Sequence, residues 1–223
     1  MALELDHVFI CCSPDAPEAD ALVRFGLLEG SSNVHPGQGT ANRRFFFRNA
    51  YLELLWVSNP AEARSEQTRH TRLWERWSSR ASGACPFGVI FRPTGAQPAA
   101  PFETWSYQPN YLPPGLSIEF ATGTPIEEPE LLYLPFIQRS GPPESEPIVH
   151  VLPIQTVFGA TVGLPSTAGL SHSARAAQSA GLLSYRLAPE HVLELSFVAN
   201  QEATFDLRPT LPLVFRGIAR DVV

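Results

Sequence analysis

The sequence contains no lysine, and all sixteen of its basic residues are arginine. Without a lysine amine, the chain cannot form a Schiff base, attach pyridoxal phosphate or build a P-loop. A glycine-rich fingerprint after a strand is absent, and so is the clustered Cys/His spacing of a zinc site. These absences leave general acid–base chemistry, metal chemistry, and binding without chemistry.

Basic tracts, long apolar runs and an export signal are missing as well. The net charge of −6, with no run of arginines to offset it, argues against a nucleic-acid partner. No apolar segment has the length of a membrane-spanning helix, and Glu4 and Asp6 interrupt the apolar stretch near the amino terminus. We therefore expect a cytoplasmic protein whose partner is a small molecule, with no membrane or nucleic-acid partner; a homodimer is compatible with the sequence.

The three cysteines leave an odd number for pairing. Cys11 and Cys12 are adjacent, so on a strand their side chains point to opposite faces and make poor disulfide partners. Together with Cys85 they are predicted to be buried free thiols.

One short segment occurs twice: LELLWV at 52–57 recurs as LELSFV at 193–198. Each copy predicts a strand with one carboxylate, Glu53 or Glu194, among apolar residues. Such a carboxylate is costly to bury unless it is paired, hydrogen-bonded or bound to a metal. Because similar strand–turn–helix segments precede both copies, the repeat predicts a duplicated α+β architecture.

The order of the predicted elements divides the chain into five parts. A first βαβββ module at 1–58 is followed by a connecting helix at 59–85. A β-rich second module with a shortened helix follows at 86–139, where frequent prolines mark strand ends and turns. A Pro-rich linker at 140–153 leads to a C-terminal βαβββ-like module at 154–223.

The segments LDHVFI at 5–10, HPGQGTANR at 35–43 and YLEL at 51–54 resemble the glyoxalase-like branch of the vicinal oxygen chelate superfamily. The resemblance implies an α+β fold of duplicated βαβββ modules, whose curved mixed sheets enclose a pocket. In the metal-dependent members, a His or Gln on the first strand and a Glu on the fourth strand of paired modules bind a divalent metal. At the matching positions this sequence has His7 and Glu53.

The residue types themselves also allow a metal site. An imidazole and a carboxylate on neighbouring strands, here His7 and Glu53, suit Mn²⁺, Fe²⁺ or Zn²⁺. Glu194 is a further candidate ligand. Counting back from Glu194 gives His150 as its partner, whereas counting back from the strand–turn–helix junction gives Phe158, which cannot bind a metal. No full ligand set is visible, so the alternative is a pocket without a cofactor.

A glycine-containing loop supplies the predicted substrate-binding side chains. His35 begins the loop HPGQGT at 35–40, whose glycines allow tight turns and close approach to a ligand. Asn42 and Arg43 follow, and their amide and guanidinium groups suit a carboxylate, phosphate or carbonyl oxygen. In the second module, Gln138 stands where a strong metal ligand would be expected; it is a weak neutral ligand at best and is a further candidate for substrate binding.

Three functions are compatible with these observations. The first is a metal-assisted lyase, isomerase or dioxygenase that acts on a small oxygenated or anionic molecule. The second is a binding or sequestering protein that uses the same pocket without metal or chemistry. The third is a structural or regulatory partner whose pocket is filled by its own aromatic side chains. The fold does not decide among them, and the sequence assigns no catalytic residue.

Overall fold

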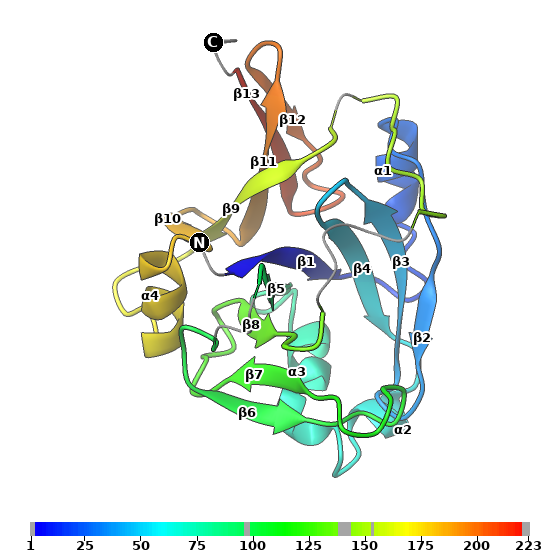
Figure 1. Cartoon of the computed structure of the whole chain (residues 1–223), viewed down its shortest axis with the longest axis vertical. Coiled ribbons are helices and arrows are strands. Elements are labelled where there is room, and N and C mark those ends of the chain that lie inside the picture. Colours follow the sequence, from blue (N-terminus) through cyan, green and yellow to red (C-terminus); the bar gives the residue numbers. More distant parts are fainter. Residues whose placement is uncertain (1–2, 96–98, 138–143, 153, 220–223) are drawn as a thin grey trace.

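The computed structural model describes residues 3–95, 99–137, 144–152 and 154–219, which form two β-sheets and four short α-helices (Figure 1). The strands of the larger sheet are β1 (Leu3–Cys11), β2 (Asn33–His35), β3 (Thr40–Phe46), β4 (Tyr51–Val57), β5 (Phe87–Pro93), β6 (Thr104–Tyr107), β7 (Ile118–Ala121) and β8 (Glu130–Tyr133). Those of the smaller sheet are β9 (Val157–Leu164), β10 (Ser184–Leu187), β11 (Val192–Ala199), β12 (Ala203–Asp206) and β13 (Leu213–Ala219). The helices are α1 (Ala19–Arg24), α2 (Pro60–Ala63), α3 (Leu73–Ser78) and α4 (His172–Ser179), with one 3-10 turn, η1, at Arg69–Thr71.

The larger sheet joins two modules through their first strands. β1 and β5 run antiparallel side by side, and each has a parallel partner on its other side, β4 beside β1 and β8 beside β5. The complete order is β2-β3-β4-β1-β5-β8-β7-β6. The predicted α+β class with curved mixed sheets is confirmed.

The smaller sheet repeats the middle of the larger one. Its order, β10-β9-β11-β13-β12, has the same parallel and antiparallel pairs as β4-β1-β5-β8-β7. It is built from two short units, β9-α4-β10 and β11-β12-β13. The carboxyl-terminal part of the chain therefore carries a reduced pair of modules, where the sequence predicted a single one.

The two sheets pack against each other through one hydrophobic core. Val8 and Ile10 on β1 point into this core, whereas His7 and Phe9 point to the opposite face, as the alternation of side chains along a strand requires. The smaller sheet fills the other side of the core with apolar residues of its three central strands, Val157, Val162, Leu193, Leu195, Leu213 and Phe215. The face of the larger sheet that carries His7 is thus turned away from the smaller sheet.

The two Leu-Glu-Leu segments do not mark equivalent strands. β4, which carries Glu53, runs parallel beside β1, whereas β11, which carries Glu194, runs antiparallel beside β9. The strand equivalent to β4 within the larger sheet is β8, where Glu130 is followed by two leucines, as Glu53 is. The predicted equivalence of Glu53 and Glu194 is therefore wrong, because a carboxylate among leucines recurs on buried strands that occupy different places.

Three short helical segments replace the single connecting helix predicted for 59–85. The Asn59 side chain accepts hydrogen bonds from two backbone N–H groups at the start of α2. Between η1 and α3, Arg72 has a left-handed φ of 54°, which interrupts the helical path. The indole N–H of Trp77 donates to the Cys12 carbonyl at 2.7 Å, and this bond holds α3 against the larger sheet.

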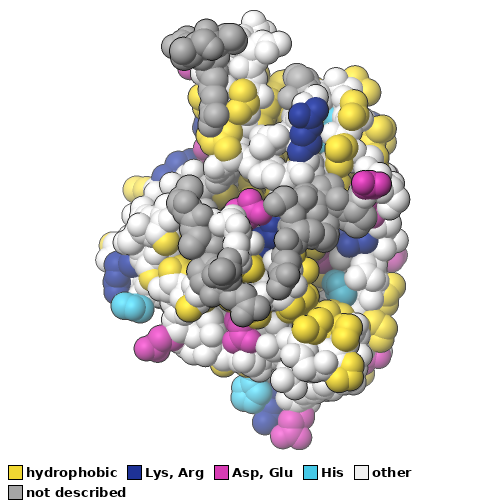
Figure 2. Space-filling model, in the orientation of Figure 1, with side chains coloured by type: hydrophobic (Ala, Val, Ile, Leu, Met, Phe, Trp, Pro, Cys, Tyr) yellow, Lys and Arg dark blue, Asp and Glu magenta, His cyan; other side chains and the backbone are white. Residues whose placement is uncertain are grey.

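The three cysteines are free and buried, as predicted. Burial raises the pKa of the Cys11 and Cys85 thiols to about 12, so both are protonated at neutral pH. No helix in the described ranges is long and apolar enough to cross a membrane. Arginine and acidic side chains are spread over several places on the face that Figure 2 shows, which agrees with the sequence's lack of a basic tract.

His150 ties the segment before the smaller sheet to the first module. Its Nδ1 accepts a hydrogen bond from the Leu28 N–H at 3.0 Å, and its Nε2 donates to the Phe46 carbonyl at 2.8 Å. Protonation of Nδ1 would break the first bond. Burial opposes the cation as well and lowers the pKa of His150 below its ordinary value. The structure gives this histidine a structural role.

The free energy of unfolding is expected to decrease as the pH falls below about 6.5, because the unfolded chain binds a proton on His150 more readily than the folded chain does. Substituting glutamine, His150→Gln, removes this contribution. Urea unfolding of both proteins from about pH 7.5 to about pH 5.5 should show the difference between them shrinking as the pH falls. A difference that stays constant over this range would contradict the assignment.

Candidate functional site

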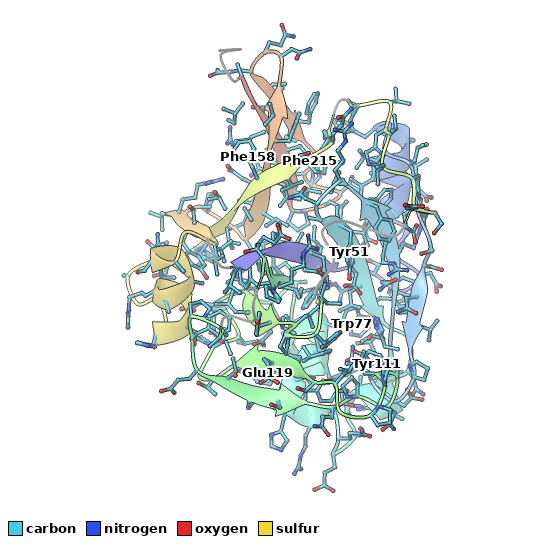
Figure 3. The ribbon with its side chains drawn as sticks, viewed as in Figure 1. Tyr51, Trp77, Tyr111, Glu119, Phe158 and Phe215 are labelled. Atoms are coloured by element: carbon cyan, nitrogen blue, oxygen red, sulfur yellow. The ribbon has the colours of Figure 1, made fainter. Side chains whose placement is uncertain are left out.

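The larger sheet bears a cavity of about 220 Å³ on the face turned away from the smaller sheet. Its polar lining comes from the first module: His7, Asn33, His35, Gln38, Asn42, Arg44 and Glu53. Its apolar lining comes largely from the second module: Ile90, Ile118, Phe120, Leu132, Leu134 and Phe136. Tyr51 on β4 and Tyr111 after β6, both labelled in Figure 3, also line it. The volume lies below the roughly 300–1,000 Å³ usual for ligand pockets, which indicates a small ligand.

His7 lies between two carboxylates. Its Nδ1 is 2.6 Å from Asp6 Oδ1, and its Nε2 is 3.4 Å from Glu53 Oε2. Burial alone would raise the pKa of Asp6, but the hydrogen bonds and charges of His7 and Arg92 outweigh burial and hold that pKa below its ordinary value. The ionised Asp6 therefore accepts a hydrogen bond from Nδ1–H, which leaves Nε2 facing Glu53. The structure thus brings His7 and Glu53 together.

Asn42 orients the carboxylate of Glu53. Its Nδ2 donates to Glu53 Oε1 at 2.6 Å, and its own Oδ1 accepts from the Asn33 N–H at 2.8 Å. The second oxygen of Glu53, Oε2, is left to His7 and the cavity. Asn42 therefore lies on the cavity face with both predicted metal-ligand candidates of the first module.

A chain of hydrogen bonds closes one end of the cavity. The Tyr111 hydroxyl donates to Gln38 Oε1 at 3.0 Å, and Gln38 Nε2 donates to Thr40 Oγ1 at 2.8 Å. Thr40 Oγ1 is also 2.9 Å from Nδ1 of His35, whose pKa is lowered by burial. Gln38 and Tyr111 were not predicted as site residues. Gln38 stands in the loop that carries the family resemblance, whereas nothing in the sequence singles out Tyr111.

Arg43 lies on the face of β3 opposite to the cavity. Its guanidinium binds both oxygens of Glu29, at 2.7 and 2.6 Å, and lies 3.1 Å from Asp20. These carboxylates, Glu29 first, raise the pKa of Arg43. Arg44 lines the cavity instead. Because side chains alternate along a strand, Asn42 and Arg44 share one face and Arg43 takes the other, so the predicted place of Arg43 is corrected to Arg44.

The donor set tests whether the cavity fits a divalent ion. His7 Nε2 and Glu53 Oε2 are 3.4 Å apart. This separation allows both atoms to bind one ion at about 2.1 Å. A further ligand would have to come from β8, where Leu132 and Glu130 point to the same face of the strand. Leu132 lines the cavity but is apolar, and the carboxylate of Glu130 pairs with Arg76 at 3.1 Å. The described residues contain no group of three or more His, Cys, Asp or Glu side chains that could hold a metal. They do not fit a resident ion that needs three or four protein ligands.

Glu194 does not join this site. Glu194 lies on the smaller sheet, where Arg186 Nε and Arg216 Nε donate to its two oxygens at 2.9 and 2.6 Å. Burial opposes the charge of Glu194, but the two guanidinium groups outweigh it and lower the pKa. Gln138 lies outside the described residues.

The fold and cavity define the class of protein: an α+β chain of paired modules with a small pocket on one face of its curved sheet. Residues 5–111 match the family model described as a glyoxalase-like domain. The predicted resemblance to the glyoxalase-like branch of the vicinal oxygen chelate superfamily is confirmed over these residues, which make up just under half of the chain. No curated protein matches the sequence.

Several solved structures have a similar fold. A hypothetical protein from Staphylococcus aureus has 9% identity, with 99% of this chain and 100% of that chain covered and a TM-score of 0.48. A methylmalonyl-CoA epimerase variant from Streptomyces coelicolor, in complex with 2-nitronate-propionyl-CoA, has 14% identity, coverage of 60% and 97%, and a TM-score of 0.41. A variant of 4-hydroxymandelate synthase from Streptomyces coelicolor has 12% identity, coverage of 98% and 63%, and a TM-score of 0.44. At these identities the likeness concerns the fold alone.

Proposed function

We propose that this protein binds, without a resident metal ion, a small molecule that has a hydrogen-bond donor such as a hydroxyl at one end and an apolar body. The observation that carries the proposal is the 3.4 Å separation of His7 Nε2 and Glu53 Oε2. Nδ1 of His7 is hydrogen-bonded to Asp6, so Nε2 of His7 and Oε2 of Glu53 both face the cavity. A ligand hydroxyl placed beside both atoms would donate its hydrogen to the carboxylate of Glu53.

The opposite wall supports an apolar body on this ligand. Ile90, Phe120 and Leu132 belong to one buried cluster on the cavity face, and they offer the ligand no hydrogen-bonding side chain. Covering apolar surface stabilises a complex by roughly 25 cal/mol per Å² before the costs of association. The polar wall therefore orients the ligand, and the apolar wall supplies much of the binding free energy.

A metal-assisted lyase, isomerase or dioxygenase is the second candidate function. The same separation of His7 Nε2 and Glu53 Oε2 favours it, since both atoms could contact one ion. It requires further ligands, and the facing wall of the second module supplies Ile90, Leu132 and Leu134 at the cavity. The donor set therefore favours binding without a resident metal.

Replacing Glu53 by glutamine is expected to weaken the binding of small alcohols and phenols roughly tenfold or more, because a charged acceptor of the ligand's donor is lost. Glu119→Gln is the matched control. Glu119 lies on β7, accepts hydrogen bonds from Ser106 and Ser117, and does not line the cavity (Figure 3). Ligand-observed NMR on the wild type and both variants measures the effect.

Equal binding by the wild type and Glu53→Gln would contradict the proposal. So would one equivalent of metal in protein purified without chelator or nickel resin, if that metal is lost in both His7→Ala and Glu53→Ala. Such a result would establish the second candidate function. We expect much less than one equivalent, and no rise in melting temperature on addition of Mn²⁺ or Zn²⁺, although a specifically bound ion would stabilise the fold by mass action.

A further inference from the structure

Arg44 supplies a positive charge at the cavity, and from its surroundings we infer that the ligand is a small carboxylic acid whose carboxylate binds this guanidinium. The inference rests on the proposed function, because it concerns the second end of the same ligand. Among the described residues that line the cavity, Arg44 is the only arginine, and the sequence has no lysine. An anionic group in this cavity therefore has one strong cationic partner.

The guanidinium of Arg44 has no carboxylate partner in the described part of the chain. The strand register places Arg44 directly opposite Glu53, yet Glu53 binds Asn42 and lies near His7 instead. Arg44 Nε and Nη2 donate to the carbonyl and hydroxyl oxygens of Ser31, both at 2.7 Å. These partners are neutral, and Nη1 has none among the described residues. The neighbouring Arg43, by contrast, is bound by two carboxylates.

The surroundings hold this guanidinium in place before a ligand arrives. Ser31, which accepts both hydrogen bonds from Arg44, is itself bound through its N–H and hydroxyl to the carboxylate of Glu146. The guanidinium carbon also lies over the rings of Phe46 and Tyr51, at 5.1 and 5.8 Å from their centres. A planar fork that is already ordered loses less entropy on binding a carboxylate, and its geometry suits two parallel hydrogen bonds.

The Tyr51 ring connects this cation to the proposed donor site. It stacks on the His7 ring with 4.2 Å between centres, and the Arg44 guanidinium carbon is 5.8 Å from the Tyr51 centre. The guanidinium carbon therefore lies no more than about 10 Å from the imidazole centre, a span that a small hydroxy acid can bridge. Glu53 repels a carboxylate placed beside it, so the acid end is directed to Arg44 and the hydroxyl end to His7 and Glu53.

The test compares acids with their uncharged amides. The probes are 3-phenyllactate and 2-hydroxy-4-methylpentanoate, each beside its primary amide, with binding measured by ligand-observed NMR and calorimetry. We expect the wild type to bind each acid roughly tenfold or more tightly than its amide. Arg44→Gln should abolish this preference, because it weakens the binding of the acids much more than that of the amides. Arg44→Lys, which keeps the charge without the fork, should retain part of it.

The control is Arg69→Gln, which changes the net charge equally at an exposed residue that does not line the cavity. Retention of the preference for acids in this variant, and its loss in Arg44→Gln of unchanged melting temperature, supports the inference. If wild-type protein binds acids and amides equally and Glu53→Gln weakens both, the inference is overturned while the proposed function stands. If the wild type binds none of the four probes at millimolar concentration, both are overturned.

Discussion

Replacing Arg76 by methionine is expected to lower the free energy of unfolding by about 3–5 kcal/mol. The side chain is fully buried on α3, where Nη1 donates to the carbonyls of Cys85 and Glu128 at 2.6 and 2.8 Å. Its Nη2 lies 3.1 Å from the carboxylate of Glu130. Methionine fills similar space but leaves these buried acceptors without partners, and each unpaired acceptor costs free energy.

The deficit of Arg76→Met should also depend on pH. Burial raises the pKa of Glu130 even with Arg76 beside it, so without Arg76 the folded chain holds a proton on Glu130 more strongly than the unfolded chain does. The free energy of unfolding of the variant therefore rises as the pH falls and Glu130 takes up its proton. The difference in free energy of unfolding between the wild type and the variant should be smaller near about pH 5 than near about pH 8. Urea unfolding at both values measures it.

Arg69→Met is the control, since Arg69 is exposed and pairs with Glu66 at 3.4 Å; its cost should stay below about 1 kcal/mol. A deficit of Arg76→Met that is equally small would show that the buried pair contributes little. A large deficit that does not change with pH would show that Glu130 stays charged in the variant. The double variant Arg76→Met with Glu130→Gln should recover part of the loss, because it removes the unpaired charge.

Replacing Arg92 by methionine is expected to destabilise the protein by about 3 kcal/mol and to weaken ligand binding at the same time. Arg92 is buried on β5 and donates to Asp6 at 2.8 Å, to Glu4 at 2.9 Å and to the Asn49 carbonyl at 2.8 Å. Its loss leaves Asp6 buried, with His7 as its remaining partner among the described residues. Because Asp6 sets which nitrogen of His7 carries the proton, the disturbance should reach the binding site.

Urea unfolding measures the first effect, and binding of the hydroxy-acid probes to folded protein measures the second. The matched variant is Arg48→Met, since Arg48 precedes Asn49 in the chain but is exposed, so it should change neither quantity appreciably. A destabilised Arg92→Met protein that still binds the probes with wild-type affinity would separate Arg92 from the site and confine it to a structural role.

The sequence predicted that His7 and Glu53 lie close together, because local patterns determine the face on which each side chain lies. An alternating strand places His7 on one face of β1, and another places Glu53 on the matching face of β4; their proximity then needs only that the two strands be neighbours. The prediction that Arg43 lines the pocket was wrong, because it did not take the same alternation of side chains into account. Asn42 and Arg43 are adjacent on one strand and cannot both face the cavity, and applying the rule to β3 would have selected Arg44.

The role of the second module could not be predicted in the same way. Which strand corresponds to β4 depends on the pairing of β5 with β8, which brings together residues about forty positions apart. The sequence repeat suggested Glu194, whereas the sheet order identifies Glu130 as the counterpart of Glu53. Glu130 in turn is neutralised by Arg76, a contact between α3 and β8 that no local pattern reveals. The position of Tyr111 at the cavity could not be predicted either, because this residue lies in a loop and no local pattern reveals its contacts.

The shared core between the two sheets makes the ligand-binding half dependent on the other half. A sheet that curves round a pocket on one face has an apolar opposite face that must be covered. Here Val8, Leu52 and Val89 lie on that face and are covered by the strands of the smaller sheet, which begin at residue 157. A fragment ending before residue 154 would leave this surface open to water and to other copies of itself. The smaller sheet thus protects the apolar face of the larger sheet from water and from aggregation. A chimera that transfers the pocket to another protein would therefore have to include both sheets.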